Sequence, residues 1–415
     1  MPVLRSASHK DLHLRWRKGN QLDLLQNGEQ FFPALFQAID AAQTSIHLET
    51  YIFNLDRTGL RLLDHLQQAC ARGVKVRVVI DGYGSLLHAQ TLAERFAAMG
   101  VQHRIYRPEP KGWARLLPNP RRLRRLHRKV AVTDGRIAFV GGINILDDFE
   151  DVPDDGLPPR PRFDFTVRVQ GPLVADIVSA QSQLWLRMGW RRRDDWEGFA
   201  RRLADWRKWR RERHTEPSSG IDSGLLATLV LRDNVRYRQT IENVYVQAIR
   251  SAKNRVVIAN AYFFPGRRLR QSLEEAAARG VRVCLLLQGR SEYPMQYRAG
   301  RFMYDKLLDD GIEVYEYQAS YLHAKVAAID ALATVGSSNL DPFSLLLARE
   351  ANVFVDDVDF SSRLVGALDA VMHNDARRVT SAGLQKRSFL GRWIDAVSYF
   401  MLRVGVALTG KSSLY

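Results

Sequence analysis

The chain has 415 residues, of which 46% are hydrophobic and 26% charged, so its composition is that of an ordinary globular protein rather than a disordered one. This length is enough for two domains, each with a sizeable core. The formal net charge of +16 is unusually high and indicates a polyanionic partner, either nucleic acid or an anionic membrane surface.

The N-terminal region and the cysteines bear on the cellular compartment. Residues 1–20 are polar and basic, without the apolar core of a signal peptide. No stretch of the sequence reaches the roughly 18 uninterrupted apolar residues of a membrane-spanning helix. We therefore expect the protein to stay on the cytoplasmic side, with Cys70 and Cys284 as buried apolar residues rather than a disulfide.

Alternating helices and strands open the first half of the chain. Apolar spacing predicts helices over 29–42 and 59–72 and strands over 45–53 and 74–80. Such alternation is typical of a largely parallel, buried sheet. His47 and Glu49 lie in the first of these strands, and we interpret them as polar groups that are satisfied in the core or at its rim.

The first of two chemically unusual motifs follows. It reads His-Arg-Lys at 127–129, then Asp134, then a Gly-Gly-x-Asn turn that ends at Asn144. Because side chains alternate along a strand, His127 and Lys129 point to the same face. Asp134 and the glycine after it predict a hairpin that returns Asn144 towards His127. A nucleophile or acid, a fixed cation and an amide donor suit a tetrahedral phosphoryl centre, whose charge increases as it is attacked.

Two basic segments flank this motif. Residues 107–128 hold eight Lys/Arg and four prolines and predict a loop, which we interpret as a rim for anionic head groups rather than a solvated surface loop. Residues 184–213 alternate five tryptophans with eleven Lys/Arg, as in a helix at a membrane interface or one packed on its own domain. The linker at 217–220 predicts a domain boundary, so the first domain spans 1–216.

The second half of the chain repeats the first. The sequence at 278–283 echoes that at 71–76, and a second motif places His323, Lys325 and Asp330 before a Gly-Ser-Ser-Asn turn. In a chain with 10 histidines, random composition would produce HxKxxxxD on the order of a few hundredths of a time. Two copies therefore indicate an internal duplication, in which each half carries one motif and neither carries a whole site.

The end of the chain differs from both halves. The second domain spans 217–385, and a C-terminal segment spans 386–415. Within this segment, residues 389–408 are rich in aromatic and aliphatic side chains but are interrupted by Arg392, Asp395 and Arg403. We interpret them as an amphipathic helix at a membrane interface, with docking onto the protein core as the alternative.

These motifs resemble those of the bacterial cardiolipin synthases in the phospholipase D superfamily. The turns at 141–144 and 336–342, the run 259–266 and the stretches 29–39 and 81–85 also fit this family. The likeness covers nearly the whole chain and is greatest for the short form, cardiolipin synthase B, which lacks N-terminal transmembrane helices. It implies an α/β, phospholipase D-like fold of two tandem similar domains, related by a pseudo-twofold axis, with the active site at their interface.

The resemblance also implies a reaction without a metal ion or another cofactor. A phosphatidyl group would pass between two phosphatidylglycerol molecules to give cardiolipin and glycerol, through a phosphatidylhistidine. A donor with another head group, such as phosphatidylethanolamine, is an alternative. His127 resembles the nucleophile and His323 the acid/base, although the duplication leaves their order open.

The family's other catalytic and phosphate-binding positions are also present. Lys129 and Lys325, with Asn144 and Asn339, would clamp the phosphoryl oxygens. Ser337 fits a phosphate contact in the second turn, whereas the matching residue of the first turn, Gly142, lacks a hydroxyl.

Four acidic residues complete the expected site. Asp134 and Asp330 belong to the catalytic motifs, where we expect them to hold strand and turn. Asp164 for His127 and Glu350 for His323 are candidates for orienting the imidazole rings.

The partners implied are anionic phospholipids, above all phosphatidylglycerol, at the cytoplasmic face of the bacterial inner membrane, where the protein would bind peripherally. Nucleic acid is not expected, because the tryptophan-rich and C-terminal segments suit lipid better. Two alternatives are a phosphodiesterase of the same superfamily, acting on nucleic acid or on other phospholipids, and a non-enzymatic membrane scaffold. The oligomeric state stays open.

Overall fold

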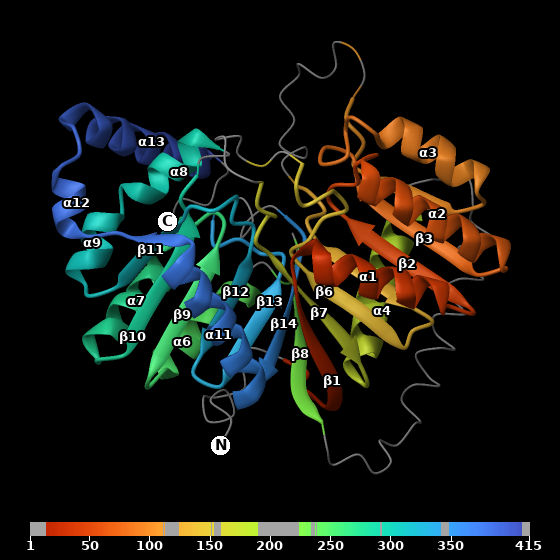
Figure 1. The fold of residues 1–415 in the computed structure, drawn as a ribbon, viewed down its shortest axis with the longest axis horizontal. Coiled ribbons are helices and arrows are strands. Elements are labelled where there is room, and N and C mark those ends of the chain that lie inside the picture. The colour runs from red at the N-terminus through yellow and green to blue at the C-terminus, as the bar shows by residue number, and fades with distance from the viewer. Residues whose placement is uncertain are drawn as a thin grey trace.

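The computed structural model describes residues 14–110, 112, 124–150, 152, 159–189, 224–233, 237, 239–290, 293–341 and 348–408. In these parts of the chain, strands from both halves join one 15-stranded sheet flanked by helices (Figure 1). The predicted linker at 217–220 and most of the basic segments 107–128 and 184–213 lie outside the described residues.

The first half alternates strands and helices as predicted. Its strands are β1 (Arg17–Gln26), β2 (Ser45–Thr50), β3 (Lys75–Asp81), β4 (Gln102–Tyr106), β5 (Lys129–Thr133), β6 (Ile137–Gly141) and β7 (Phe165–Gln170). Its helices are α1 (Asn27–Asp40), α2 (Arg57–Ala71), α3 (Ala89–Ala98) and α4 (Leu173–Gly189). The predicted elements are confirmed, with ends that differ by a few residues.

The second half has a matching set of elements. Its strands are β8 (Leu225–Arg232), β9 (Arg255–Asn260), β10 (Arg282–Gln288), β11 (Glu313–Tyr317), β12 (Lys325–Ile329), β13 (Leu332–Gly336), β14 (Glu350–Asp356) and β15 (Ala376–Arg378). Its helices are α6 (Thr240–Ser251), α7 (Arg267–Ala278), α8 (Pro294–Arg301), α9 (Tyr304–Asp309), α11 (Val358–Asn374), α12 (Ser381–Gln385) and α13 (Phe389–Leu408).

The strand order confirms the duplication. From the centre of the sheet outwards, the first half runs β1-β7-β6-β5-β2-β3-β4, and the second half runs β8-β14-β13-β12-β9-β10-β11. β1 and β8 pair with each other in the antiparallel sense at the centre. The two halves are therefore related by a pseudo-twofold axis between β1 and β8, and they share one continuous sheet.

The sheet is mixed, so the prediction of a largely parallel sheet is wrong. β2, β3 and β4 pair in the parallel sense, as do β9, β10 and β11. The other named strands pair in the antiparallel sense. The reason is that each motif forms a hairpin, β5–β6 or β12–β13, whose first strand runs opposite to its neighbour β2 or β9.

Three large apolar cores among the described residues hold this architecture together. One lies under α1 and α2 in the first half, and another under α6 and α7 in the second half. A third core combines side chains of β5, β6 and β7 with side chains of β9, β12, β13 and β14. Because this third core contains strands of both halves, their relative position is fixed by buried apolar surface.

An aspartate closes each motif hairpin. Asp134 and Asp330 have φ angles of 52° and 50°, a left-handed conformation that aspartate tolerates. The Asp134 carboxylate accepts hydrogen bonds from the backbone N–H groups of residues 43–45 at 2.8–2.9 Å. The Asp330 carboxylate does the same for residues 253–255 at 2.8–3.0 Å. These contacts support the predicted role in holding strand and turn.

Several side chains that the sequence left between a structural and a functional role pack against the core. Glu49 is buried and forms an ion pair with Arg128 at 2.7 Å. The His47 ring lies edge-on to Trp185, which is itself buried in the first half. Trp185 therefore packs on its own domain. Cys70 and Cys284 are free thiols as predicted. Cys284 is buried, whereas Cys70 is only partly buried, so the prediction of burial is wrong for Cys70.

The C-terminal helix α13 packs on the protein by one face. Asp395 is buried there and forms ion pairs with Arg298 of α8 and with Arg387. The Tyr399 ring lies 5.2 Å from Phe264 and 4.6 Å from Phe302, measured between centroids. The alternative of docking onto the protein is thus confirmed for this face of the helix.

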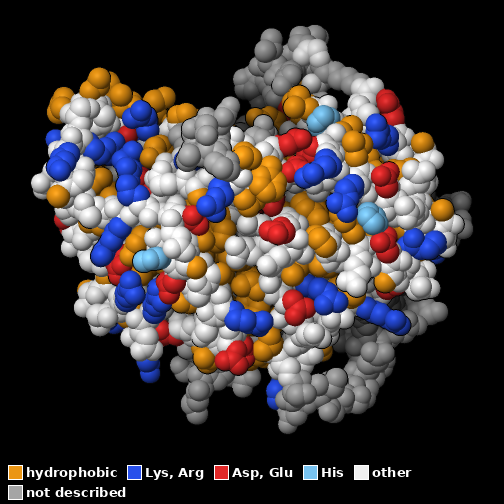
Figure 2. Space-filling model, in the orientation of Figure 1, with side chains coloured by type: hydrophobic (Ala, Val, Ile, Leu, Met, Phe, Trp, Pro, Cys, Tyr) orange, Lys and Arg blue, Asp and Glu red, His pale blue; other side chains and the backbone are white. Residues whose placement is uncertain are grey.

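The other face of α13 is apolar and exposed. Figure 2 shows hydrophobic side chains gathered at the upper left, where α13 lies in Figure 1. The exposed side chains, at 40–80% relative accessibility, are Phe389, Leu390, Trp393, Phe400, Met401 and Val404. Within the described residues no helix, α13 included, combines the length and apolarity needed to cross a bilayer.

The aspartate in the first hairpin turn yields a stability prediction. Asp134→Ala removes the acceptor of three backbone N–H groups and places alanine at a positive φ, so we expect the free energy of unfolding to fall by roughly 1–3 kcal/mol at neutral pH. Thermal unfolding followed by circular dichroism measures the change. The free energy of unfolding of Asp134→Asn, whose side chain tolerates the same φ but carries no charge, should lie between those of Asp134→Ala and the wild type.

The same aspartate predicts a pH dependence. Partial burial tends to raise the pKa of Asp134, but the N–H donors of residues 43–45 outweigh it and hold the pKa below its ordinary value of 3.8. The stabilisation is therefore complete above the unfolded-state pKa and is lost as the pH falls through the lower folded-state pKa. The difference in unfolding temperature between wild type and Asp134→Asn should shrink at acidic pH. A difference that stays constant on acidification would show that the carboxylate charge contributes nothing.

Candidate active site

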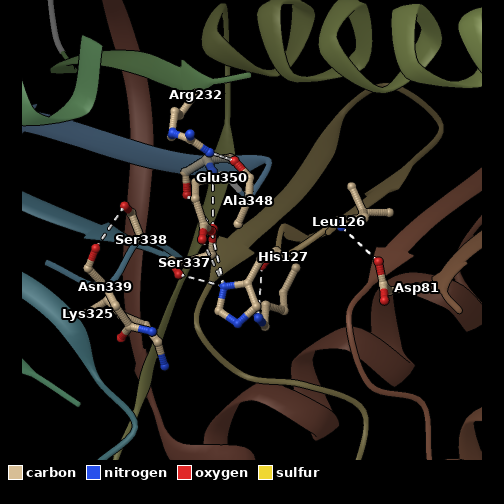
Figure 3. A network of polar contacts seen from close by, with 12 residues as sticks. Asp81, Leu126, His127, Arg232, Lys325, Ser337, Ser338, Asn339, Ala348 and Glu350 are labelled. Carbon is tan, nitrogen blue, oxygen red and sulfur yellow. Dashed lines mark hydrogen bonds and ion pairs between the residues drawn. The ribbon is translucent and has the colours of Figure 1, made fainter. Parts of the chain in front are cut away.

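His127 lies just before β5, where the two halves meet. Its backbone N–H donates to the carbonyl of Arg349 at 3.0 Å, and the N–H of Arg349 donates to the carbonyl of Arg125 at 2.8 Å. On the ring, Nδ1 lies 3.1 Å from Glu350 Oε1 and 3.1 Å from the Ser337 carbonyl oxygen (Figure 3). Both neighbours are acceptors, so the proton resides on Nδ1 and Nε2 is left for chemistry.

His323 has the equivalent arrangement just before β12. Its backbone N–H donates to the carbonyl of Phe163 at 2.9 Å, and the N–H of Phe163 donates to the carbonyl of Tyr321 at 3.0 Å. Its Nδ1 lies 2.6 Å from Asp164 Oδ2. Each histidine is therefore held, through both its backbone and its ring, by the opposite half of the chain.

The structure corrects the pairing of histidines with carboxylates. We predicted Asp164 for His127 and Glu350 for His323, but Asp164 contacts His323 and Glu350 contacts His127. The reason lies in the strand order. β7 and β14, at whose beginnings the carboxylates stand, lie between the motif hairpins and the centre of the sheet. Their first residues therefore reach across the interface to the other half.

Ser337 was predicted to contact the phosphate, but it does not line the cavity. Its hydroxyl is fully buried, donates to Glu350 Oε2 at 2.6 Å and accepts from the Ala351 N–H at 3.1 Å. It therefore positions the carboxylate that holds the first histidine. In the first half, a Cβ on Gly142 would stand 2.3 Å from Asp164 Oδ1. The shorter acid thus requires glycine beside it, whereas glutamate, one methylene longer, leaves room for serine.

Burial controls the protonation of the site. It is the main cause that lowers the pKa of His127 and, more strongly, that of His323, and the charges of Lys129 and Lys325 lower both further. Burial lowers the pKa of Lys129 to about 7, with Lys325 as the next cause. It also raises the pKa of Asp164 to about 7, against the opposing charge of Lys325. Both imidazoles are therefore neutral at pH 7, so each Nε2 has a free lone pair.

In the predicted clamp the lysines are buried below the cavity surface, whereas the asparagines line the cavity. Lys129 and Lys325 are almost completely buried, and each Nζ donates to the carbonyl of the histidine two residues before it. Asn144 and Asn339 line the cavity above them. The oxygen of Asn144 accepts the Ile52 N–H at 3.2 Å, so its amide NH₂ is the group that can donate to a phosphoryl oxygen.

One cavity of about 490 Å³ unites both motifs. It is lined by both histidines and both asparagines, together with Arg125 and Arg162. This volume lies in the range of roughly 300–1,000 Å³ that is usual for small-molecule sites. The cavity is therefore large enough to hold a small polar group beside the two histidines. Among the described residues, no cluster of His, Cys, Asp and Glu is arranged to hold a metal ion.

Further residues near the histidines were not singled out for the site from the sequence. Asp81 accepts the Leu126 N–H at 2.8 Å, and Gln288 accepts the Leu322 N–H at 2.7 Å, so each fixes the residue before a histidine. The Tyr51 ring lies 4.9 Å from the His127 ring. Their place in the sequence could have indicated them, because Asp81 and Gln288 are the last residues of strands and Tyr51 directly follows a strand.

Two histidine hairpins that meet at one cavity across a pseudo-twofold axis define a phospholipase D-like protein. The fold agrees with the crystal structure of phosphatidylserine synthase from Haemophilus influenzae Rd KW20, at a TM-score of 0.67 and 14% identity over 97% of this chain and 98% of that one. The family model described as cardiolipin synthase, PLD-like domain, matches residues 35–148 and 245–372. The chain belongs to this cardiolipin synthase family of phospholipase D-like proteins.

Curated relatives extend the match over nearly the whole chain. Cardiolipin synthase B of Salmonella typhimurium (strain LT2) is 40% identical over 397 residues, which are 95% of this chain and 91% of that protein. Cardiolipin synthase B of Escherichia coli (strain K12) is 39% identical over 396 residues, with the same coverage of both chains.

The crossed pairs predict distinct effects for the two carboxylates. Asp164→Asn should abolish the downfield Nδ1 proton resonance of His323 and leave that of His127. Glu350→Gln should move the His127 resonance upfield without abolishing it, because the Ser337 carbonyl remains as an acceptor, and should leave that of His323. NMR of protein labelled with ¹⁵N-histidine measures both resonances. Turnover should fall on the order of 10²- to 10⁴-fold in Asp164→Asn, because the wrong tautomer leaves Nε2 of His323 protonated, and less in Glu350→Gln.

Asp148→Asn is the control for this experiment, because Asp148 also lines the cavity but is hydrogen-bonded to the N–H of Gly28. It should leave both histidine resonances in place. If Asp164→Asn shifted the resonance of His127 instead, the crossed arrangement would be wrong.

Proposed function

We propose that the protein is a cardiolipin synthase that joins two phosphatidylglycerol molecules and releases glycerol. The observation that carries this proposal is the cavity at which His127 and His323 meet, each with its Nδ1 held by a carboxylate and its Nε2 left for chemistry. The identity to cardiolipin synthase B over 95% of the chain supports the choice of reaction within this site class.

The proposed reaction has two displacements at one phosphorus. His323 first takes up a proton on Nε2 as the anionic donor binds beside it. Nε2 of His127 then attacks the donor phosphorus, the bond from phosphorus to the head-group oxygen breaks, and His323 gives that oxygen its Nε2 proton, so glycerol leaves. His323 then takes a proton from the hydroxyl of the acceptor lipid, whose oxygen attacks the same phosphorus and breaks its bond to His127. We assign these roles to the two histidines as the order of the motifs in the family implies.

Fixed cations and amides would lower the barrier of both displacements. Asn144 and Asn339 would donate to the phosphoryl oxygens, and the buried charges of Lys129 and Lys325 would stabilise the charge that develops there. Since burial makes the charged form of Lys129 costly, an anionic phosphodiester in the cavity favours its protonation. Substrate binding therefore completes the charge balance of the site.

The histidines provide the test of this proposal. We expect His127→Ala and His323→Ala each to abolish cardiolipin formation from phosphatidylglycerol micelles, measured by lipid mass spectrometry. Phosphatidyl-p-nitrophenol, whose leaving group needs no proton, separates their roles. His323→Ala should still release a burst of p-nitrophenol and carry a phosphatidyl group on the peptide that contains His127.

His127→Ala should show neither the burst nor the adduct, and circular dichroism serves as the control for folding. A wild-type protein that makes no cardiolipin would refute the proposed reaction. An adduct on His323 in place of His127 would reverse the roles of the two histidines.

We further propose that the protein binds the cytoplasmic face of the bacterial inner membrane peripherally, through its basic charge and the exposed face of α13. The helix packs on α8, and Tyr293 and Gln296, at the beginning of α8, line the cavity. α13 is therefore separated from the cavity by α8 alone. A lipid seated against α13 would place its head group near the histidines while its acyl chains stay in the bilayer.

Two exposed side chains of α13 test this attachment. The double substitution Trp393→Ser with Phe400→Ser should reduce binding to phosphatidylglycerol vesicles on the order of tenfold or more, because each aromatic ring contributes about 1.5–3 kcal/mol when buried in lipid. The loss should persist at high salt, which screens the basic charge but not apolar insertion. Vesicle co-sedimentation measures both conditions.

Leu60→Ser, an exposed apolar position on α2, serves as the control and should bind like the wild type. If the double variant also bound like the wild type at every salt concentration, α13 would not be the anchor.

A further inference from the structure

A synthase that joins two phosphatidylglycerol molecules must bind two phosphodiesters, and the inference that follows rests on that proposed function. The donor phosphate reacts at the histidines. The acceptor also carries a phosphodiester, which does not react and keeps its negative charge throughout. In the proposed reaction the asparagines and lysines around the histidines hold the donor's phosphoryl group, so the acceptor phosphate needs a cationic site of its own in the same cavity.

The pseudo-twofold axis shows where the two walls of the cavity differ. The bridge between Leu126 and Arg349 on the His127 side matches the bridge between Leu322 and Phe163 on the His323 side. Arg349 and Phe163 therefore occupy equivalent places, and so do the residues directly before them. These are Ala348 beside His127 and Arg162 beside His323, and both line the cavity.

Arg162 is built into this wall. Its backbone N–H donates to the backbone carbonyl of Asp148 at 3.0 Å. Its guanidinium carbon lies 5.3 Å from the centroid of the Tyr321 ring. Its charge is among the causes that lower the pKa of His323, after burial and the two lysines. The guanidinium is thus close enough to act on that histidine, and its planar donors match the oxygens of a phosphodiester.

The other arginine of the cavity stands on the opposite wall in a different setting. Arg125 forms an ion pair with Glu109 and lies 3.8 Å from Asp81, and its guanidinium carbon is 4.9 Å from the centroid of the Tyr83 ring. Two carboxylates therefore balance its charge and tie it to the loops of the first half.

We propose that Arg162 binds the unreacted phosphodiester of the acceptor phospholipid and so selects a phosphatidylglycerol over a simple alcohol. The acceptor enters on the wall of His323, and its terminal glycerol hydroxyl points to Nε2 of that histidine, which takes its proton. Water and free glycerol have no phosphate, so they reach the phosphatidylated enzyme without help from Arg162.

A partition experiment measures this selection. Phosphatidylglycerol micelles are supplied with radiolabelled glycerol, and the enzyme forms cardiolipin when phosphatidylglycerol is the acceptor and labelled phosphatidylglycerol when glycerol is the acceptor. Both products arise from the same phosphatidylated enzyme, so their ratio reports on acceptor choice alone. Arg162→Ala should lower the ratio of cardiolipin to exchange on the order of tenfold or more, the loss of a hydrogen bond to a charged group.

Matched variants separate the effect of the positive charge of Arg162 from the effects of its shape and of its position in the cavity. Arg162→Lys should keep part of the ratio, and Arg162→Gln should behave like alanine although it retains a long polar side chain. Arg125→Ala should keep the wild-type ratio within about twofold, whatever it does to the total rate, because it lies on the other wall.

The outcomes are distinct. A wild-type ratio in Arg162→Ala would overturn the acceptor site and leave the synthase proposal standing, provided that the wild type makes cardiolipin. An equal fall in Arg125→Ala and Arg162→Ala would also overturn it, because the effect would then reflect general charge. A wild type that forms neither product would refute the proposed function itself.

Discussion

The site depends on two hydrogen bonds that cross the molecule, from His127 Nδ1 to Glu350 and from His323 Nδ1 to Asp164. Each bond fixes the orientation and tautomer of one imidazole, and each requires both halves in register. The register comes from the apolar core that combines strands of both halves and from the β1–β8 pair at the centre of the sheet. Stability of the interface and competence of the site are therefore consequences of the same contacts.

Around this symmetric frame the two sides of the cavity have diverged. Glutamate with serine stands on one side, and aspartate with glycine on the other, because the length of the acid decides whether a side chain fits beside it. Alanine faces arginine across the same axis, at 348 and 162. Such asymmetry suits a reaction in which the two histidines do different things, on a donor and an acceptor that bind differently.

Local patterns in the sequence predicted what depends on local physics. The helices and strands, the duplication and the two hairpins follow from periodicity and spacing, and Asp134 and Asp330 hold their turns as expected. The crossed carboxylates could not be predicted, because distance along the chain does not say which half a side chain faces. The mixed sheet was missed for a related reason, since alternation of elements does not reveal that a hairpin enters antiparallel. The exposed face of α13 was visible as amphipathicity, but only packing shows that Asp395 is buried rather than exposed.

The crossing also bears on how such a chain could have arisen. A precursor with a single motif would have carried a histidine and a carboxylate that could not meet within one copy. Two identical copies, paired through the strands equivalent to β1 and β8, would have supplied each histidine with the acid of its neighbour. Such a precursor would have been active only as a homodimer, and fusion of two copies would have turned an association that depends on concentration into a permanent one. After fusion each copy could mutate alone, which a symmetric dimer does not allow.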